Sequence, residues 1–436
     1  MKILNINISD DAVYNGGSAV AALRLHEALL QNNVNSQMLV ANKKSNMDSI
    51  ITISKKNIRK RIWNKSDGSL LLKYKKTISR NLGPFSPQIV SNKKLVKAIN
   101  EINPDIVHLH WICDGFLSIE DIAKISAPIV WSLHDMGAFT GGCHLAVEHV
   151  SLDSGERVSS RSESGILCDK YTQNCGRCDF LGSQKSKDLS FKILQRKKRE
   201  FAKIKSMAII GVSRWMADCA RKSAVFSDRT VVCLPNPINT NVFKPIDKYS
   251  SRLLWNLPKD KKLILFGTVA ATSMPYKGYD LLVETLNKIS SENVEFVVFG
   301  SNEPKNPPKL PREIRYLGHL HDNVSLVSLY SACDVMVVPS KRENLPNVIM
   351  ESLSCGAPVV CFDIGGSSDM VNHKINGYLA QPFDTLDMAN GIDWVLNSEN
   401  YYELSQNARG KIIREFDYGV VVKKYINLYE ETLRND

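Results

Sequence analysis

The residues best placed to do chemistry lie between Pro339 and Glu351, in the sequence PSKRENLPNVIME. A buried strand is expected to end near Pro339, and a helix to begin at Pro346, because proline suits the first helical position. Glu343 then lies in the loop, and Glu351 lies one to two turns inside the helix. Two carboxylates and the free N–H groups of a helix start could bind the hydroxyls and phosphate of a sugar nucleotide. Two solvated acids around an ordinary helix start are the competing interpretation.

Short β-rich runs alternate with longer helical stretches along the chain, which predicts parallel sheets covered on both faces. A proline- and asparagine-rich segment, residues 234–245, interrupts this rhythm, which then restarts. We therefore expect two α/β domains, residues 1–240 and 246–415, followed by a helix over 416–436. The expected strands are Lys2–Ile8, Gln37–Ala41, Ile106–His110, Ile129–Leu133, Ala208–Val212 and Thr230–Leu234, then Leu263–Gly267, Val294–Gly300, Ile314–Leu317, Val335–Pro339 and Pro358–Asp363.

The composition is that of an ordinary globular protein: 436 residues, 43% of them hydrophobic and 23% charged. These values exclude a disordered or coiled-coil chain. The absence of any run of 18 apolar residues excludes a membrane-spanning helix, and the strand-like N-terminus is unlike a signal peptide. We therefore expect a cytoplasmic protein.

The formal net charge is +11, and nearly all of the surplus lies in residues 43–80. This segment interleaves Lys and Arg with apolar and aromatic residues such as Ile58, Trp63 and Tyr74. Such a mixture suits the surface of an anionic membrane, and we predict peripheral binding to the inner face of the cytoplasmic membrane. A solvated loop and helix is the alternative. Nucleic acid is not favoured as a partner, because no nucleic-acid-binding motif accompanies the charge.

A polar stretch, about residues 141–185, carries four clustered cysteines: Cys143, Cys168, Cys175 and Cys178. Their spacing suits a tetrahedral thiolate site for structural zinc, with His144 as an alternative ligand. Metal binding could organise a stretch that otherwise lacks a core. Scattered buried thiols are the second interpretation. Disulfides are the third, and a reducing compartment disfavours them.

The stretch around Glu343 and Glu351 resembles the Glu-x7-Glu motif of family 4 glycosyltransferases, and other motifs of that family recur in the expected order. They are the Gly16-Gly17 loop, His134-Asp135 after a strand, the segment Leu234–Ile238, Ile364–Val371 as the Gly-Gly-x-x-Glu loop with Asp369 in place of Glu, and Asn376–Leu379. The resemblance covers most of the chain. It implies the GT-B fold, an α/β architecture of two Rossmann-like doubly wound parallel-sheet domains facing across a cleft. It also implies that the last helix packs on the first domain.

The activity implied by the resemblance is transfer of a sugar, with retained configuration, from a UDP- or GDP-sugar to an acceptor held by residues 1–240. Glu343 would bind hydroxyls of the donor sugar, and Glu351 the nucleotide ribose. Lys277 would neutralise the diphosphate. His134 would lie near the reaction centre, with Asp135 orienting it or the acceptor. The residues expected to contact the donor are Gly16, Gly17, Lys277, Glu343, Asn344, Leu345, Pro346, Asn347 and Glu351.

The sequence departs from the family in the loop after Gly267, where an Arg is usual and Thr268–Thr272 stand instead. Lys277 then acts alone, or a second cation such as Lys341 or Arg342 substitutes. No Asp-x-Asp motif follows a strand, so we expect catalysis that needs no divalent ion.

The resemblance and the basic segment together predict a hexosyltransferase that extends a lipid-linked glycan in cell-surface polysaccharide synthesis, such as lipopolysaccharide O-antigen or capsule. Two alternatives stay open, a GT-B sugar-nucleotide epimerase and a non-catalytic sugar-nucleotide-binding protein. A glycogen-phosphorylase-like enzyme would need a pyridoxal-binding Lys, for which no sequence context is visible.

Overall fold

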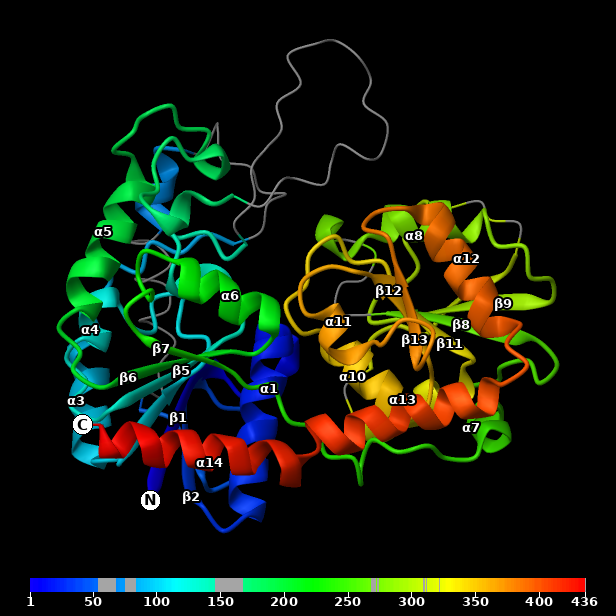
Figure 1. The fold of residues 1–436 in the computed structure, drawn as a ribbon, viewed down its shortest axis with the longest axis horizontal. Helices are drawn as coiled ribbons and strands as arrows, with labels where there is room; N and C mark the ends of the chain where they lie inside the picture. Colours follow the sequence, from blue (N-terminus) through cyan, green and yellow to red (C-terminus); the bar gives the residue numbers. More distant parts are fainter. Residues whose placement is uncertain are drawn as a thin grey trace. The chain divides into compact units, whose positions relative to one another are not determined.

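The computed structural model describes residues 1–53, 68–74, 84–145, 168–267, 272, 274–308, 310, 312–320 and 322–435. The chain divides into two compact units, each with its own sheet (Figure 1). Unit 1 comprises residues 1–235 and 422–436, and unit 2 comprises residues 236–421. The prediction of two successive α/β units is confirmed.

Unit 1 is built on a parallel sheet of seven strands in the order β3-β2-β1-β4-β5-β6-β7. The strands are β1 (Lys2–Ser9), β2 (Asn35–Asn42), β3 (Ile50–Ile51), β4 (Ile106–Leu109), β5 (Ile129–Leu133), β6 (Met207–Gly211) and β7 (Thr230–Cys233). The helices include α1 (Ala12–Gln31), α3 (Lys93–Ile102), α4 (Ile119–Ile122), α5 (Leu189–Phe201) and α6 (Arg214–Lys222). The strand order reverses between β1 and β4, and open α/β sheets bind ligands at the carboxyl ends of strands beside such a point.

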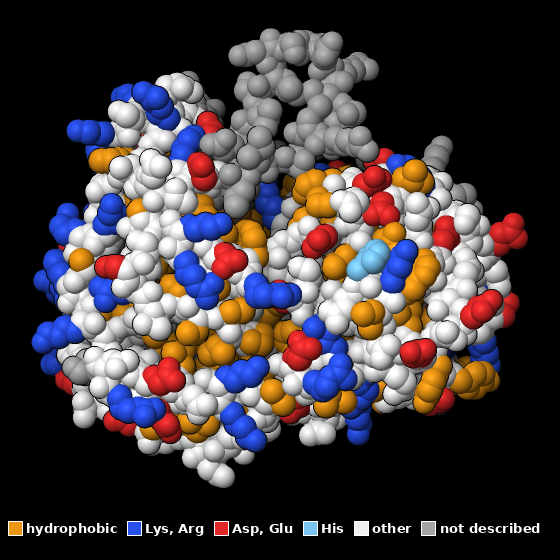
Figure 2. All heavy atoms as spheres, viewed as in Figure 1, with side chains coloured by type: hydrophobic (Ala, Val, Ile, Leu, Met, Phe, Trp, Pro, Cys, Tyr) orange, Lys and Arg blue, Asp and Glu red, His pale blue; other side chains and the backbone are white. Residues whose placement is uncertain are grey.

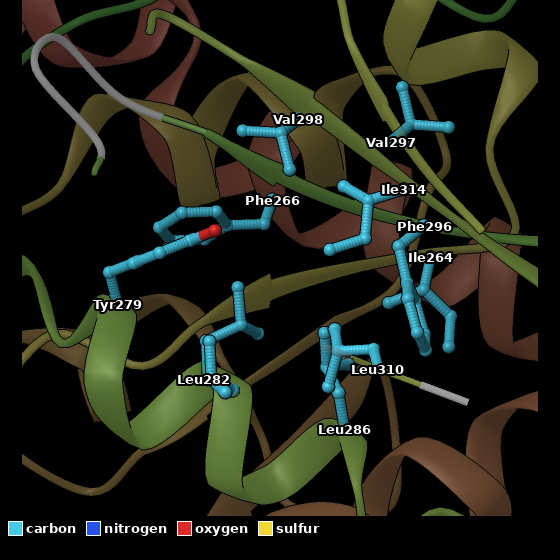
Figure 3. A pocket seen from close by; sticks show the side chains of 11 residues that line it. Ile264, Phe266, Tyr279, Leu282, Leu286, Phe296, Val297, Val298, Leu310 and Ile314 are labelled. Carbon is cyan, nitrogen blue, oxygen red and sulfur yellow. The ribbon is translucent and has the colours of Figure 1, made fainter. Parts of the chain in front are cut away.

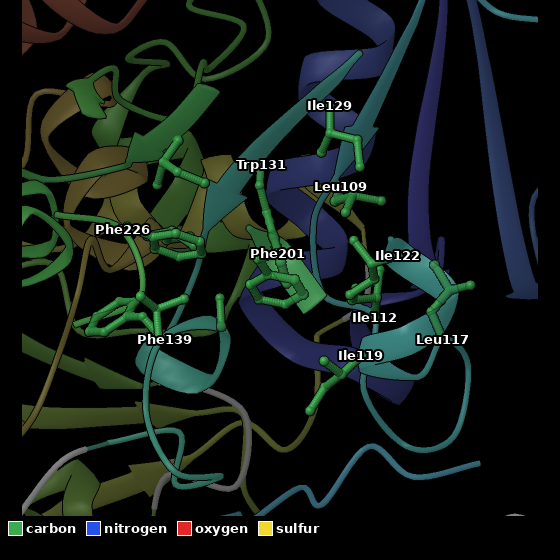
Figure 4. Packing of buried hydrophobic residues seen from close by; sticks show 14 of the residues in the cluster. Leu109, Ile112, Leu117, Ile119, Ile122, Ile129, Trp131, Phe139, Phe201 and Phe226 are labelled. Carbon is green, nitrogen blue, oxygen red and sulfur yellow. The ribbon is translucent and has the colours of Figure 1, made fainter. Parts of the chain in front are cut away.

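Aromatic residues fill the core of unit 1 between β5 and its helices (Figure 4). The rings of Phe201 and Phe226 stack with centroids 6.1 Å apart, and Trp131 stands edge-on to Phe201 at 5.7 Å. Offset and edge-on contacts of this kind add to the gain from burying the rings themselves. This packing fixes β5, whose carboxyl end leads into the His134 loop.

Part of the cysteine-rich stretch belongs to the same core. Tyr171, Phe180 and Leu181 are at most 3% exposed and lie within the apolar cluster of unit 1. The expectation that this stretch lacks a core is therefore wrong for residues 168–185. Single apolar residues in a polar sequence show no periodicity, so the sequence pattern could not reveal their burial.

Unit 2 is built on a parallel sheet of six strands in the order β10-β9-β8-β11-β12-β13, which reverses between β8 and β11. The strands are β8 (Lys262–Gly267), β9 (Val294–Phe299), β10 (Ile314–Tyr316), β11 (Val335–Val338), β12 (Val359–Phe362) and β13 (Gly377–Ala380). The helices are α7 (Lys248–Leu254), α8 (Tyr279–Leu286), α9 (Asn323–Ala332), α10 (Asn347–Ser354), α11 (Ser367–Met370), α12 (Thr385–Leu396) and α13 (Tyr401–Phe416). Helices α8 and α12 pack together beside the sheet (Figure 1).

A small cavity of about 10 Å³ lies between α8 and the sheet of unit 2 (Figure 3). Apolar side chains line it, among them Phe266, Leu282, Phe296 and Leu310. A water molecule needs about this much space and two or more polar partners as well. The cavity is therefore a packing gap and not a ligand site.

Helix α14 (Tyr418–Arg434) begins in unit 2, and its residues from Val422 onward belong to unit 1. Within unit 1, the hydroxyl of Tyr429 lies 2.7 Å from Nδ1 of His108, and Ser206 donates to the carbonyl oxygen of Thr432 at 3.1 Å. The predicted domain boundaries lie at residues 240, 246 and 416, whereas the two units divide at 235/236 and 421/422. The second division falls inside a helix, where the sequence shows no break.

Residues 54–67 and 75–80 of the basic segment 43–80, which is predicted to bind an anionic membrane, lie outside the described residues. On the described surface shown in Figure 2, Lys and Arg side chains are interspersed with Asp and Glu. None of the helices in the described ranges combines the length and apolarity that a bilayer crossing requires.

Candidate functional site

Two of the predicted donor-binding residues meet at the carboxyl edge of the unit 2 sheet. Glu343 lies in the loop after β11, and Lys277 lies in a short 3-10 turn in the loop after β8. Oε1 of Glu343 accepts hydrogen bonds from Nζ of Lys277 at 2.6 Å and from Oγ of Ser340 at 3.0 Å. These loops follow the two strands between which the sheet order reverses. The pair therefore occupies the position where open α/β sheets bind ligands.

Two glycines allow the surrounding loops to approach Glu343 closely. Gly278 has φ +72°, and a Cβ there would collide with the carbonyl oxygen of Pro339. Gly365, in the loop after β12, has φ +53°, and a Cβ there would collide with the carbonyl oxygen of Glu343. The next residue, Gly366, donates its N–H to the carbonyl oxygen of Asn344 at 2.7 Å. Three motifs that are separate in sequence thus close into one site through contacts that only glycine permits.

The ion pair at this edge is largely shielded from solvent, with side-chain exposures of 16% for Lys277 and 13% for Glu343. Burial lowers the pKa of Lys277, but the charge and the hydrogen bond of Glu343 outweigh it and hold that pKa above its ordinary value. Lys277 therefore stays protonated at neutral pH. The site offers a permanent ammonium group next to a carboxylate, which suits a ligand that carries both phosphate and hydroxyl groups.

Glu351 lies in α10, within the body of unit 2, and is 5% exposed. Its Oε2 accepts a hydrogen bond from the hydroxyl of Tyr330, on α9, at 2.9 Å. Pro346 stands at the N-cap, and Asn347 is the first residue of the helix, so the helix begins one residue later than predicted. Of the remaining predicted donor contacts, Leu345 is buried.

The family's missing Arg falls at residues 268–271, which lie outside the described residues. Of its two candidate substitutes, Lys341 is bound by Oδ2 of Asp280 at 2.7 Å. Arg342 is half-buried, and that burial lowers its pKa from the ordinary value. The charge of the Lys341 ammonium is thus already neutralised by a carboxylate. The Arg342 guanidinium is instead affected mainly by its partial removal from solvent.

In unit 1 the predicted Gly16-Gly17 turn appears as a break in α1. Gly16 has φ +57° and ψ −140°, values that are not helical and that favour glycine. A Cβ at Gly16 would meet no atom within 4 Å, so the backbone borders open space. A ligand could approach the chain closely at this point.

His134 follows β5 and ends a chain of hydrogen bonds that begins on β1. Nδ2 of Asn5 donates to Ser36 at 2.9 Å, so its Oδ1 accepts from Nε2 of His110 at 3.2 Å. Nδ1 of His110 then accepts from Nε2 of His134 at 3.0 Å. Burial lowers the pKa of His134 to about 4, and burial also lowers that of His110 well below its ordinary value. Both rings are neutral near pH 7, and Nδ1 of His134 carries a lone pair.

Asp135 holds its own loop together. One carboxylate oxygen accepts from Nε1 of Trp111 at 2.8 Å and from Nδ1 of His144 at 2.7 Å. The other accepts from the N–H of Gly137 at 2.7 Å. Burial raises the pKa of Asp135, but His144 and these donors outweigh it and hold that pKa below its ordinary value. The carboxylate is therefore ionised, and three donors position it.

Ser86, His144 and Asp135 have the spacing of a nucleophilic triad, because Nε2 of His144 also lies 2.8 Å from Oγ of Ser86. Burial lowers the pKa of His144, but the charge of Asp135 outweighs it and raises that pKa to about 10. A protonated His144 donates to Ser86 and cannot take its proton. The buried Ser86 and His144 and the partly exposed Asp135 thus form a structural bridge. Both ring nitrogens are engaged, so the suggestion that His144 could replace a zinc ligand is wrong.

The four clustered cysteines lie near one another, and burial together with the neighbouring thiols raises the pKa of Cys143 and Cys175. Burial also raises the pKa of Cys178, and it outweighs the backbone N–H groups of Leu181 and Phe180, which lower it. Across the described ranges, however, no group of three or more His, Cys, Asp or Glu side chains is arranged to hold a metal ion. Structural zinc stays a prediction. Elemental analysis would test it, with a Cys175→Ser/Cys178→Ser variant as the comparison: stoichiometric zinc lost in the variant would support it, and metal-free folded protein would contradict it.

The comparisons with known proteins agree with this geometry. Residues 260–398 match the family model described as "Glycosyl transferases group 1". Over its whole length the chain superposes on sucrose-phosphate synthase from Thermosynechococcus elongatus, with a TM-score of 0.68, 17% identity and full coverage of both chains. It also superposes on Anabaena HepE in complex with UDP-glucose, with a TM-score of 0.64 and 15% identity, covering 99% of this chain and all of the other. The fold is GT-B.

Sequence relatives of this GT-B protein include proteins named as glycosyltransferases. One is the N,N'-diacetylbacillosaminyl-diphospho-undecaprenol alpha-1,3-N-acetylgalactosaminyltransferase of Campylobacter jejuni, 26% identical over 52% of this chain and 61% of the relative. The chain spans about half the length of the curated relatives that it matches. The matched family region, 260–398, contains Lys277, Glu343 and Glu351.

Proposed function

We propose that this protein is a retaining glycosyltransferase, of the family 4 type and a hexosyltransferase, that uses a nucleotide-sugar donor. The observation that carries the proposal is the closure of three loops of unit 2 around the Lys277–Glu343 pair, with Glu351 in the following helix. Neighbours with the same fold bind UDP and UDP-glucose, which supports a donor of this class.

In the proposed reaction, the diphosphate of the donor competes with Glu343 for Lys277. The released carboxylate then binds hydroxyls of the donor sugar, while Glu351 binds the ribose. The bond between the anomeric carbon and the diphosphate breaks, and the acceptor oxygen bonds to that carbon on the same face. The acceptor's proton passes to the departing diphosphate. Lys277 and the N–H groups at the start of α10 stabilise the negative charge of the departing diphosphate, and no divalent ion is required.

We propose a lipid-linked glycan in cell-surface polysaccharide synthesis as the acceptor, held by unit 1. The Campylobacter relative, whose name gives an undecaprenol-diphosphate-linked acceptor, supports this assignment. The basic segment 43–80 would bring the enzyme to an anionic membrane surface.

A thermal-shift screen against UDP-, GDP-, ADP- and dTDP-sugars tests the donor site. One nucleotide sugar should raise the melting temperature, and Glu343→Ala should weaken the response to the whole donor more than the response to the bare nucleotide. An equal loss for both would contradict the role of Glu343. Turnover of the donor without an acceptor into an isomeric nucleotide sugar would instead indicate an epimerase, and binding with neither transfer nor hydrolysis a non-catalytic protein.

A further inference from the structure

Gln88, between β3 and α3 in unit 1, is held in a backbone conformation that a glutamine rarely adopts. Its φ is +49°, in the left-handed region that disfavours residues other than glycine. The surroundings fix it there. Arg196 donates to the carbonyl oxygens of Pro87 and Gln88, each at 3.2 Å, and the N–H of Ile119 donates to the latter oxygen at 3.3 Å.

Arg196, which holds the backbone of Gln88, is itself held by a bidentate ion pair. Arg196 binds both carboxylate oxygens of Glu120, at 2.9 Å and 2.7 Å. Backbone strain of this kind persists only where the surrounding contacts over-determine it, and it is concentrated at binding and catalytic sites. The strained position therefore points to a task for the Gln88 side chain.

That side chain is 1% exposed, and its Nε2 has no hydrogen-bond partner within the described part of the chain. Native proteins leave few buried polar atoms unpaired, because each costs about 1–3 kcal/mol. The glutamine side chain could avoid this cost by turning toward solvent, and an apolar residue at this position would not incur it. A fixed, buried N–H donor without a partner is what a binding site presents before its ligand arrives.

Gln88 lines a cavity of about 20 Å³ at the carboxyl ends of β4 and β5, together with His110, His134 and Asp135. This is room for about one hydroxyl-sized group. No Lys or Arg lines the cavity, both histidines are neutral, and Asp135 is ionised. An anionic group would be repelled there, whereas a neutral hydroxyl could accept a hydrogen bond from Nε2 of Gln88. Trp111 and Trp131 add aromatic surface to the lining, which suits a sugar.

We propose that Gln88 is a specificity-determining residue whose Nε2 donates a hydrogen bond to a neutral hydroxyl of the acceptor sugar. The proposal rests on the proposed function, because it assumes an acceptor in unit 1. Gln88 lines the cavity, and the Arg196–Glu120 pair holds its strained backbone in place before the ligand binds.

Two substitutions separate this role from a structural one. Gln88→Asn tolerates a left-handed backbone but is one methylene shorter, so its amide falls short of the ligand. Gln88→Gly removes the amide and relieves the strain, so the melting temperature should not fall. Gln195→Asn is the matched control, because Gln195 lies on the surface of α5 and pairs only with Asn174 in the described structure.

The assay uses the nucleotide sugar found in the thermal-shift screen and a panel of octyl glycosides of common hexoses and N-acetylhexosamines as acceptors. Release of the nucleoside diphosphate is measured with and without glycoside. Both Gln88 variants should raise KM for the preferred glycoside about tenfold, since a buried partner is left unpaired. Hydrolysis of the donor without glycoside, and KM for the donor, should stay within twofold.

The outcomes are distinguishable. Normal glycoside kinetics in Gln88→Asn and Gln88→Gly would overturn the role of Gln88 and leave the proposed function standing. Equal losses in transfer and in donor hydrolysis would show a structural effect and would also overturn it. A protein that turns over no donor would overturn both the proposed function and this inference.

Discussion

The carboxyl edges of the two sheets present opposite kinds of chemistry. In unit 2 the edge carries a charged pair, Lys277 and Glu343, held by loops that glycines bring together. In unit 1 the corresponding edge carries neutral histidines tied into the strands by hydrogen bonds, with Asp135 compensated by His144. Under the proposed function, these edges would bind a charged diphosphate in unit 2 and a neutral polyol in unit 1. The charges near each edge, and not the topology, make the difference.

The largest expected effect is the loss of stability on breaking the Asp135–His144 pair in unit 1. Asp135→Asn leaves His144 buried without its counter-charge and should cost about 3–5 kcal/mol of unfolding free energy near pH 6. The pKa of His144 is raised from 6.5 to about 10, so the pair's contribution is full below pH 6.5 and is lost as pH rises through 10. The penalty of the variant should therefore shrink by pH 9.

Urea denaturation at pH 6 and pH 9 measures this penalty. Asp280→Asn is the control, since that carboxylate pairs with Lys341 at an exposed position and should cost less than about 1 kcal/mol. If the loss of unfolding free energy in Asp135→Asn were larger at pH 9 than at pH 6, the predicted pH dependence would be wrong.

Removing the ammonium in unit 2 should impair chemistry more than folding. Lys277→Met should lower kcat/KM for the donor about 10²–10³-fold, as the loss of a group that stabilises charge on a leaving oxygen commonly does. Release of the nucleoside diphosphate measures it. Lys288→Met, which breaks the surface pair with Glu284 in the same unit, should change the rate less than twofold. Similar losses in both variants would argue against a specific role for Lys277.

A smaller effect, on nucleotide binding, is expected from the buried contact between Tyr330 and Glu351 in unit 2. Tyr330→Phe removes the hydroxyl that donates to Glu351, and should weaken binding of the bare nucleoside diphosphate about five- to tenfold. Titration calorimetry measures the affinity. Tyr378→Phe, which deletes the bond to Asp387 elsewhere in unit 2, serves as the control and should leave the affinity unchanged. An unchanged affinity in Tyr330→Phe as well would remove Glu351 from the nucleotide site.

The last prediction is that the His134 ring does not titrate near neutral pH. Burial lowers the pKa of His134 from 6.5 to about 4, so its ring should stay neutral, with the proton on Nε2, from pH 8 to pH 6. Nitrogen chemical shifts of the imidazole, assigned by their loss in His134→Gln, report both charge and tautomer. A midpoint between pH 6 and pH 7 would contradict a neutral edge in unit 1.

The loop positions of Lys277 and Glu343 in unit 2 were predictable because each residue stands near a glycine or a proline whose backbone role can be read from the sequence. Their donor-binding roles were predicted from the family resemblance. Lys277 adjoins Gly278, and Glu343 lies three residues before Pro346. The alternation of strands and helices likewise predicted the sheets, apart from the two-residue strand β3 and from β13, which only the family resemblance indicated. Two residues are too few to show a period.

The unit 1 site was only partly predictable, because its bonds join residues far apart in the chain. Ser86 and His144 are separated by 58 positions, and Asn5 and His110 by 105. A polar residue within a strand looks the same whether it faces water or a buried partner. Gln88 carried no signal at all, since nothing in a sequence marks a glutamine that tertiary contacts force into a left-handed conformation.

Helix α14 has a consequence for synthesis on the ribosome. Residues 236–421 form a contiguous unit that can fold as soon as it emerges, whereas the sheet of unit 1, nearly all of it made earlier, lacks its final helix until residues 422–436 are released. Until then His108 has no Tyr429 to bind, and the buried tyrosines of that helix are missing from their places against the sheet. The first sheet to be translated is therefore the last to be completed, and nascent chains halted before residue 422 should depend on chaperones.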